Sequence, residues 1–232
     1  MDRNGFVIGA FSKCGIKISD SQAEKFVKLY EFLVEYNENV NLTAITGFED
    51  VVIKHFVDSV LPFTMIDLKK NSTFIDVGTG AGFPSIPLMI YRNDLTGTLL
   101  EALAKRCVYL EKACKLVGIE ANIVHGRAED YAKEKREFFD IATARAVAGM
   151  PVLCEYCIPY VKTGGMFVAL KSVNEDLFQS DNAVKVLGGR AVKSEDYEIT
   201  NGDSRRLFVI EKIAHTPTKY PRNPAMIKKK PL

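Results

Sequence analysis

Apolar and polar positions divide the chain into a helical N-terminal part and a longer part where short apolar segments alternate with helices. Within residues 1–68, apolar side chains recur every three or four residues, as between Phe26 and Val34. Ser19 and Gln22 precede that run with the spacing of a capping box. We expect further helices over residues 48–56 and 59–66, after an Asn- and Thr-rich loop over residues 37–46.

From residue 73 onward the pattern predicts an α/β fold. The expected strands cover residues 73–77, 98–101, 121–125, 140–144 and 165–170, and the expected helices cover residues 85–91, 105–117, a stretch ending at 161, and 174–187. Residues 162–165 are expected to form a turn. Residues 197–200 and 207–213 flank the turn at Asn201-Gly202-Asp203 and predict an antiparallel pair at one edge. We therefore predict a mostly parallel seven-stranded sheet with helices on both faces. It would occupy residues 69–232 with a basic tail, behind an N-terminal helical extension over residues 1–68.

A glycine-rich loop follows the first expected strand. Asp76 ends that strand, and glycine then occupies every second position at 78, 80 and 82, before Phe83 and a helix. Glycine lets backbone come close to a ligand and tolerates positive φ. Because Phe83 stands where a dinucleotide fingerprint has its third glycine, the spacing disfavours a nicotinamide cofactor. It looks like the first motif of the Rossmann-like methyltransferases that use S-adenosylmethionine, and it makes Asp76, Gly78 and Gly80 candidate cofactor residues.

Polar side chains at the ends of the next strands extend this candidate site. Glu101 ends the second strand, where a carboxylate accepts both hydroxyls of a ribose. After the third strand, Glu129 is a candidate acceptor for the adenine amine, with Ala128 and Phe83 as apolar wall. Arg145 ends the fourth strand and is a candidate for the cofactor carboxylate or a substrate phosphate. The alternatives are a solvated acid for Glu101, a helix-dipole contact for Glu129 and a structural ion pair for Arg145.

Composition and charge limit the class of protein. The 232 residues are 47% hydrophobic and 26% charged, as in an ordinary globular protein. No apolar run approaches the roughly 20 residues of a membrane span, so the expected compartment is the cytoplasm. The five cysteines are expected to be reduced and packed, with no metal bound. The net charge is only +2, yet residues 212–232 hold six Lys or Arg and no acid, which suggests either a nucleic-acid footprint or a solvated tail.

Several further motifs resemble one family over nearly the whole chain. They are Asn41-Leu42-Thr43-Ala44-Ile45-Thr46, Lys54-His55-Phe56-Val57-Asp58-Ser59, Asp76 to Pro84, Leu103-Ala104-Lys105-Arg106, Arg127-Ala128-Glu129, Thr143-Ala144-Arg145-Ala146, Ala169-Leu170-Lys171, and the tail pieces Lys219-Tyr220-Pro221-Arg222 and Lys228-Lys229-Lys230-Pro231-Leu232. Together they resemble the bacterial 16S rRNA (guanine-N7)-methyltransferase G family, also called glucose-inhibited division protein B. Two positions depart from the family pattern: Glu101 replaces the usual Asp, and Ser85 a common glycine.

The resemblance implies a class I methyltransferase fold and a reaction. An enzyme of this family moves a methyl group from S-adenosylmethionine to N7 of one guanine of 16S rRNA, near the decoding centre. By motif, the implied cofactor contacts are Gly78, Phe83, Glu101, Ala128, Glu129 and Arg145. The implied RNA contacts are His55, Arg145, Lys171 and Arg222, to which the basic tail adds Lys228, Lys229 and Lys230. Arg145 is the expected positioning residue, with no general base. The expected partner is 16S rRNA or the small ribosomal subunit, without membrane or metal, and the chain is expected to be a monomer.

Three other functions fit parts of the sequence. A small-molecule or protein methyltransferase on the same fold would not need the basic tail. A nicotinamide-dependent oxidoreductase conflicts with Phe83. An rRNA-binding assembly factor without catalysis would not need an intact cofactor site, so cofactor binding distinguishes it from an enzyme.

Overall fold

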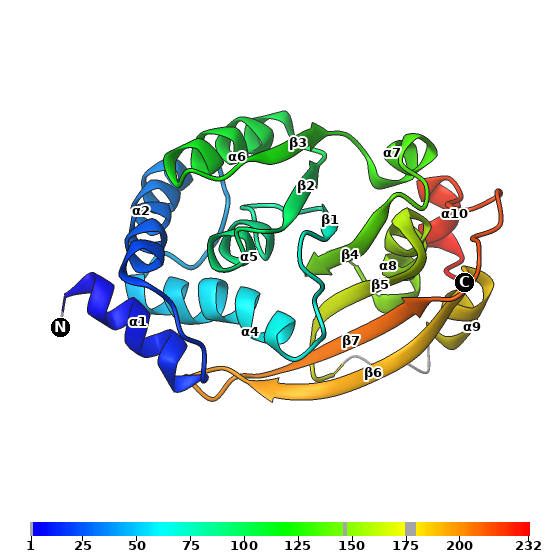
Figure 1. Ribbon diagram of the computed structural model, residues 1–232. Helices are drawn as coiled ribbons and strands as arrows, with labels where there is room; N and C mark the ends of the chain where they lie inside the picture. The colour runs from blue at the N-terminus through cyan, green and yellow to red at the C-terminus, as the bar shows by residue number, and fades with distance from the viewer. Residues whose placement is uncertain (1, 146–147, 175–179) are drawn as a thin grey trace.

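A seven-stranded sheet forms the centre of the molecule (Figure 1). The computed structural model describes residues 2–145, 148–174 and 180–232. The strand order is β3-β2-β1-β4-β5-β7-β6. All pairs from β3 to β5 are parallel, whereas β7 is antiparallel to both β5 and β6. The predicted α/β class, the mostly parallel sheet and the antiparallel edge are confirmed.

The strand bounds agree with the prediction where strands are short and buried. The strands are β1 (Thr73–Val77), β2 (Thr96–Glu101), β3 (Ala121–His125), β4 (Phe139–Arg145), β5 (Val161–Ser172), β6 (Gly189–Glu198) and β7 (Ser204–Lys212). The predicted bounds of β1 and β3 are confirmed, and β2 and β4 are slightly longer than predicted.

Helices cover both faces of the sheet. They are α1 (Arg3–Lys13), α2 (Asp20–Asn37), α3 (Phe48–Val51), η1 (Val52–Val57), α4 (Asp58–Thr64), α5 (Ser85–Tyr91), α6 (Ala104–Leu116), α7 (Ala128–Glu134), α8 (Met150–Cys157), η2 (Ile158–Tyr160), α9 (Asp181–Val186) and α10 (Pro224–Lys229). The capping box predicted at Ser19 and Gln22 is present at the start of α2. Of the described helices, none has the length and apolar character needed to cross a bilayer.

Three predicted element bounds are wrong, and a fourth prediction falls partly outside the described residues. The expected turn at residues 162–165 is part of β5, where a bulge shifts the register with β4. The helix predicted to end at 161 ends at Cys157, and η2 follows it. Of the helix predicted over residues 174–187, only α9 is described, and residues 175–179 lie outside the described part. β6 begins at residue 189 instead of 197, because most of its side chains are exposed and polar, as expected of an edge strand.

Each face of the sheet has its own hydrophobic cluster. Phe74, Leu99, Ile141 and Val168 point to one face, where helices of residues 1–68 pack together with α5 and α6. Side chains from the other face of the same strands pack against α7, α8, α9 and α10. The N-terminal helices are therefore a layer over the sheet and share its core.

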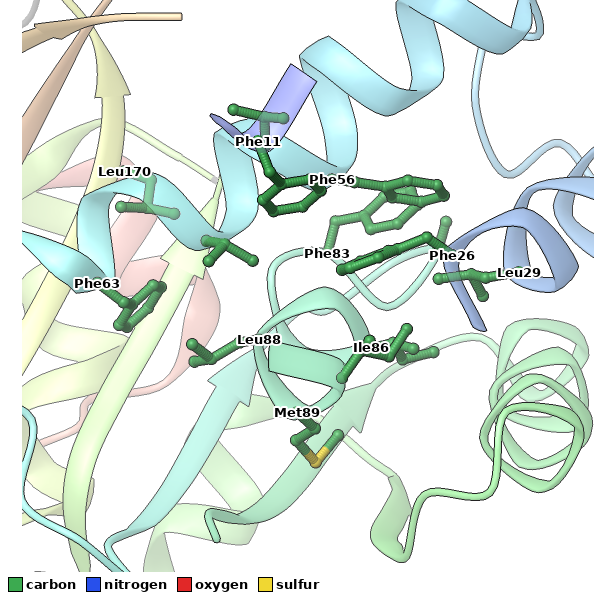
Figure 2. Packing of buried hydrophobic residues seen from close by; sticks show 14 of the residues in the cluster. Phe11, Phe26, Leu29, Phe56, Phe63, Phe83, Ile86, Leu88, Met89 and Leu170 are labelled. Atoms are coloured by element: carbon green, nitrogen blue, oxygen red, sulfur yellow. The ribbon is translucent and has the colours of Figure 1, made fainter. Parts of the chain in front are cut away.

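A row of aromatic rings links this N-terminal layer to the glycine loop (Figure 2). The ring centroids of Phe11 and Phe26 are 4.9 Å apart, those of Phe26 and Phe56 5.1 Å, and those of Phe56 and Phe83 6.0 Å. Phe83 thus packs into the N-terminal layer. This contact fixes the position of the residue that begins the turn into α5.

All five cysteines are unpaired, and four of them are buried, as predicted. Burial raises the pKa of the Cys114 and Cys154 thiols to about 12. Such thiols are not nucleophiles at neutral pH, because the reactive species is the thiolate.

Candidate functional site

The glycine loop is bound to the carboxyl ends of β1 and β2. Gly78, Gly80 and Gly82 all have positive φ, of 74°, 61° and 84°. The Gly78 amide donates to the Leu100 carbonyl at 2.9 Å, and the Gly80 amide donates to Glu101 Oε2 at 3.0 Å. A side chain at position 82 would place Cβ 2.5 Å from Ile86 Cδ1. The loop conformation therefore depends on glycine both for φ and for packing.

Asp76 lies beneath this loop and is completely buried. Its Oδ2 accepts a hydrogen bond from Thr79 Oγ1 at 2.7 Å and another from Ser85. Its Oδ1 is buried without a hydrogen-bond partner. Burial raises the pKa of Asp76 to about 6. Asp76 shapes the loop and presents one unsatisfied acceptor.

Glu101 occupies the place expected for a ribose acceptor. Its carboxylate is 5% exposed, with Oε1 accepting from the Leu103 amide at 2.9 Å and Oε2 accepting from Gly80. Arg106 Nη1 is 3.8 Å from Oε2. A carboxylate offers about four lone-pair positions, so two backbone amides leave capacity for two hydroxyls.

Gly78 and Glu101 line a cavity of about 620 Å³, within the roughly 300–1,000 Å³ typical of small-molecule sites. We call it the glycine-loop cavity. Its lining includes Gly78, Glu101, Ala128 and Glu129, which the sequence had predicted. It also includes Val152, Tyr156 and Pro224, which the sequence did not indicate as site residues, and Lys228, which the sequence suggested as an RNA contact. Nothing in the sequence places α8 and α10 beside the glycine loop, because only tertiary packing does so.

Asp76, Gly80, Phe83 and Arg145 are outside the lining of the glycine-loop cavity. Asp76 and Gly80 support the loop, as described above. Phe83 faces the N-terminal layer, where the His55 ring stacks on it with a centroid distance of 4.7 Å and an interplanar angle of 20°. The guanidinium of Arg145 lies 5.3 Å from the centre of the same ring.

Arg145 lines a second cavity of about 420 Å³, which we call the arginine cavity. Its polar lining consists mainly of cationic or basic side chains around one buried acid: Lys54, His55, Asp58, Arg145, Lys171, Tyr197 and Arg205. Asp58 Oδ2 is 3.4 Å from Arg145 Nη1 and 3.6 Å from Arg205 Nε. Its Oδ1 accepts from the Tyr197 hydroxyl at 3.0 Å. Asp58 therefore holds α4, β4, β6 and β7 around this cavity.

The two cavities adjoin at the carboxyl end of the sheet. Asp76 of β1 pairs with Thr143 of β4, and Gly78 and Arg145 each lie two residues beyond this pair on neighbouring segments. Lys171, which lines the arginine cavity, donates to the carbonyl of Ala148, which lines the glycine-loop cavity, at 2.6 Å. Lys171 and Ala148 therefore connect the linings of the two cavities.

His55 is a neutral group in this site. Its Nε2 is 2.9 Å from Thr43 Oγ1, and its Nδ1 is 3.4 Å from Arg145 Nη2. Burial, with the Arg145 charge as the second cause, lowers the pKa of His55 to about 4. Any contact it makes with RNA at neutral pH is therefore a hydrogen bond or a stacking contact.

We expect His55 to lower the stability of the protein in mild acid. The folded pKa of about 4 lies below the ordinary value of 6.5, so the neutral ring stabilises the fold above pH 6.5, and this contribution is lost as the pH falls toward 4. His55→Phe keeps an aromatic ring on Phe83 but removes the titration. Between pH 7 and 4.5, wild type should lose on the order of 1–2 kcal/mol more of its urea-unfolding free energy than the variant. Equal losses in both proteins would contradict this assignment.

The basic residues near the C-terminus fall into two groups. Lys212 is buried, with Nζ 3.0 Å from Glu137 Oε1, and Arg222 forms a two-pronged ion pair with the buried Glu155. Lys228, Lys229 and Lys230 are exposed. The basic strip that the sequence suggested therefore consists partly of structural ion pairs, and an RNA contact by Arg222 stays a prediction.

The sheet order, the glycine loop and Glu101 define a class I methyltransferase that uses S-adenosylmethionine. Solved structures support this class through the fold. A precorrin-6y C5,15-methyltransferase from Geobacter metallireducens superposes with a TM-score of 0.53 at 13% identity, over 67% of this chain and 87% of that one. The TYW2 protein of M. jannaschii, solved in complex with AdoMet, gives a TM-score of 0.51 at 16% identity, over 66% of this chain and 74% of that one.

Sequence comparison identifies the family. The family model described as rRNA small subunit methyltransferase G matches residues 22–204. Proteins named ribosomal RNA small subunit methyltransferase G are 46% identical in Alkaliphilus metalliredigens, over 94% of each chain, and 44% identical in Clostridium perfringens, over 96% of each. The chain belongs to the rRNA small subunit methyltransferase G family, as the sequence motifs had predicted.

The glycine-loop cavity fits the cofactor of this class. Glu101, which lines the cavity, accepts from two backbone amides and keeps acceptor capacity for ribose hydroxyls. Among the described residues, no three His, Cys, Asp or Glu side chains are grouped so that they could hold a metal ion.

Proposed function

We propose that this protein transfers a methyl group from S-adenosylmethionine to N7 of one guanine of 16S rRNA, near the decoding centre. The observation that supports this most directly is the pair of adjoining cavities in a chain of this family. One is bordered by a glycine loop and two acids, and the other is lined by cationic side chains. The acids of the first cavity suit the hydroxyl and amine donors of a nucleoside cofactor, and the cationic side chains of the second suit the phosphate of a nucleotide acceptor.

The cofactor would be held by the glycine-loop cavity, with Gly78 near its backbone, Glu101 at the ribose and Ala128 with Glu129 at the adenine. S-adenosylmethionine supplies an electrophilic methyl group on a positively charged sulfur. Asp76 and Gly80 keep the loop in place through the hydrogen bonds described above.

The acceptor nucleotide would enter the arginine cavity. Lys54 and Lys171 line this cavity, and their positive charges suit a phosphate of the nucleotide. The buried carboxylate of Asp58 would accept hydrogen bonds from N–H groups of the base. Arg145, held by Asp58 and by the Phe83 ring, would orient the guanine so that N7 faces the adjoining cavity. His55, stacked on the same Phe83 ring, would contribute a neutral contact.

No general base is required for this reaction. The N7 lone pair lies in the plane of the guanine ring and bears no proton, so attack can precede any proton transfer. The contribution of the protein is then proximity and alignment, for which effective molarities are large. Arg145 is a positioning residue in this scheme, since its guanidinium remains protonated at any working pH.

Methyl transfer from labelled S-adenosylmethionine tests this function. The acceptors are naked 16S rRNA and small subunits from a strain lacking this protein, followed by mapping of the modified base. Label in one guanine as 7-methylguanosine is expected. Cofactor binding without transfer to either acceptor would indicate another acceptor class. Absence of cofactor binding would favour an rRNA-binding assembly factor without catalysis.

A further inference from the structure

The C-terminal segment, residues 213–232, is folded against the protein next to the glycine-loop cavity. Its anchor is Arg222, whose Nε and Nη2 donate to Glu155 Oε1 and Oε2 at 2.8 and 2.6 Å, while its backbone amide donates to Oε1 at 2.8 Å. Glu155 has no exposed surface. Arg136 adds hydrogen bonds from Nη1 to the Tyr220 carbonyl and from Nη2 to the Thr216 carbonyl, both at 2.6 Å. The path of the segment up to α10 is therefore fixed by charged, partly buried contacts.

Helix α10 continues from this anchor and packs against α8. Asn223 caps it by accepting a hydrogen bond from the Met226 amide at 2.9 Å, and Ile227 is completely buried in the cluster on that face of the sheet. Pro224 and Lys228 are four residues apart, so they lie on one face of the helix. Both line the glycine-loop cavity, as does Ala128.

We propose that α10 is a wall of the cofactor site, with Pro224 and the aliphatic stem of Lys228 covering the adenosine together with Val152 and Tyr156. This rests on the proposed function, because it takes the glycine-loop cavity as the site of S-adenosylmethionine. These side chains supply the apolar surface that the sequence had assigned to Phe83. The charged end of Lys228 stays in water while its stem covers apolar surface, as lysine commonly does.

Lys228 then has a different role from Lys229 and Lys230, which follow it in the sequence. Lys228 belongs to the cofactor site, whereas Lys229 and Lys230, which are exposed and outside that lining, are left to contact RNA. It also makes the Glu155–Arg222 pair a positioning element for cofactor binding, because this pair fixes the start of α10.

Binding of S-adenosylhomocysteine in the absence of RNA provides the test. In Pro224→Ala/Lys228→Ala the dissociation constant, measured by calorimetry, should rise about tenfold or more, equivalent to about 1.4 kcal/mol. The matched control is Met226→Ala/Lys229→Ala, which changes the exposed side of the same helix, Met226 being 52% exposed. Its S-adenosylhomocysteine affinity should stay within about twofold of wild type, even where its RNA affinity falls.

Hydrogen exchange in the wild-type protein gives a second, substitution-free measurement. S-adenosylhomocysteine should slow amide exchange in residues 222–230 several-fold, because the ligand would hold α10 closed. Unchanged exchange there, or wild-type affinity in the Pro224→Ala/Lys228→Ala variant, would overturn the proposal. If wild type binds S-adenosylhomocysteine with protection of α10 but does not methylate 16S rRNA, the proposed function fails and this inference stands. If wild type binds no S-adenosylhomocysteine, both fail.

Discussion

Arg145→Ala is expected to lower methyl transfer about 100-fold or more while leaving cofactor affinity almost unchanged. The reason is geometric: Arg145 lines the arginine cavity, outside the lining of the glycine-loop cavity, so its removal disturbs the acceptor. Misplacement of a reactant by about 1 Å is enough for a loss of about 100-fold. Single-turnover transfer to small subunits and calorimetric binding of S-adenosylhomocysteine measure the two effects separately.

Two controls belong to this experiment. Arg145→Lys keeps the positive charge beside Asp58 but loses the planar group that lies over Phe83. Compared with Arg145→Ala, it should therefore restore the thermal stability of wild type more fully than the rate of methyl transfer. Thermal unfolding checks the fold, because Asp58 retains Tyr197 and Arg205 as partners in both variants. Unchanged turnover in Arg145→Ala would mean that the residue is a structural ion-pair partner only.

Glu101→Gln is expected to weaken S-adenosylmethionine binding by about 10- to 150-fold. The wild-type carboxylate accepts from the amides of Gly80 and Leu103 through different oxygens, and a carboxamide has only one acceptor oxygen. A hydrogen bond to a charged group contributes about 1.5–3 kcal/mol, which corresponds to this range of dissociation constants. The loss has two sources, the ribose contact and the position of the loop.

Glu101→Asp is the matched comparison, since it keeps the negative charge. It also keeps both carboxylate oxygens on a shorter side chain, so we expect a loss of less than about tenfold. Equal loss in the Gln and Asp variants would show that side-chain length, rather than charge, matters here. Affinities within twofold of wild type in both would place the ribose elsewhere.

Local sequence signals predicted the sheet and four residues of the glycine-loop cavity lining. The strands at residues 73–77 and 121–125 are short apolar runs with clear boundaries, and both bounds were right. Gly78, Glu101, Ala128 and Glu129 follow strand ends, and parallel strands bring their carboxyl ends to one edge. Such residues can be assigned to one site without any knowledge of how the helices pack.

The remaining site residues depend on long-range packing. Phe83 follows the glycine loop directly in sequence, yet its ring packs on Phe56 and His55 in the N-terminal layer. Tyr156 and Pro224 come from helices that meet only in the folded protein. β6 was predicted too short, because an exposed edge strand needs few apolar residues and gives no alternating pattern.

The Glu155–Arg222 pair has a consequence for the synthesis of the protein. Glu155 is completely buried, while its charged partner follows it by 67 residues along the chain. During translation, domains fold from the N-terminus onward, so the charge of Glu155 has no partner until Arg222 has been synthesised. A buried charge without its partner costs several kcal/mol. Chains truncated shortly before residue 222 should therefore be several kcal/mol less stable than chains that include Arg222.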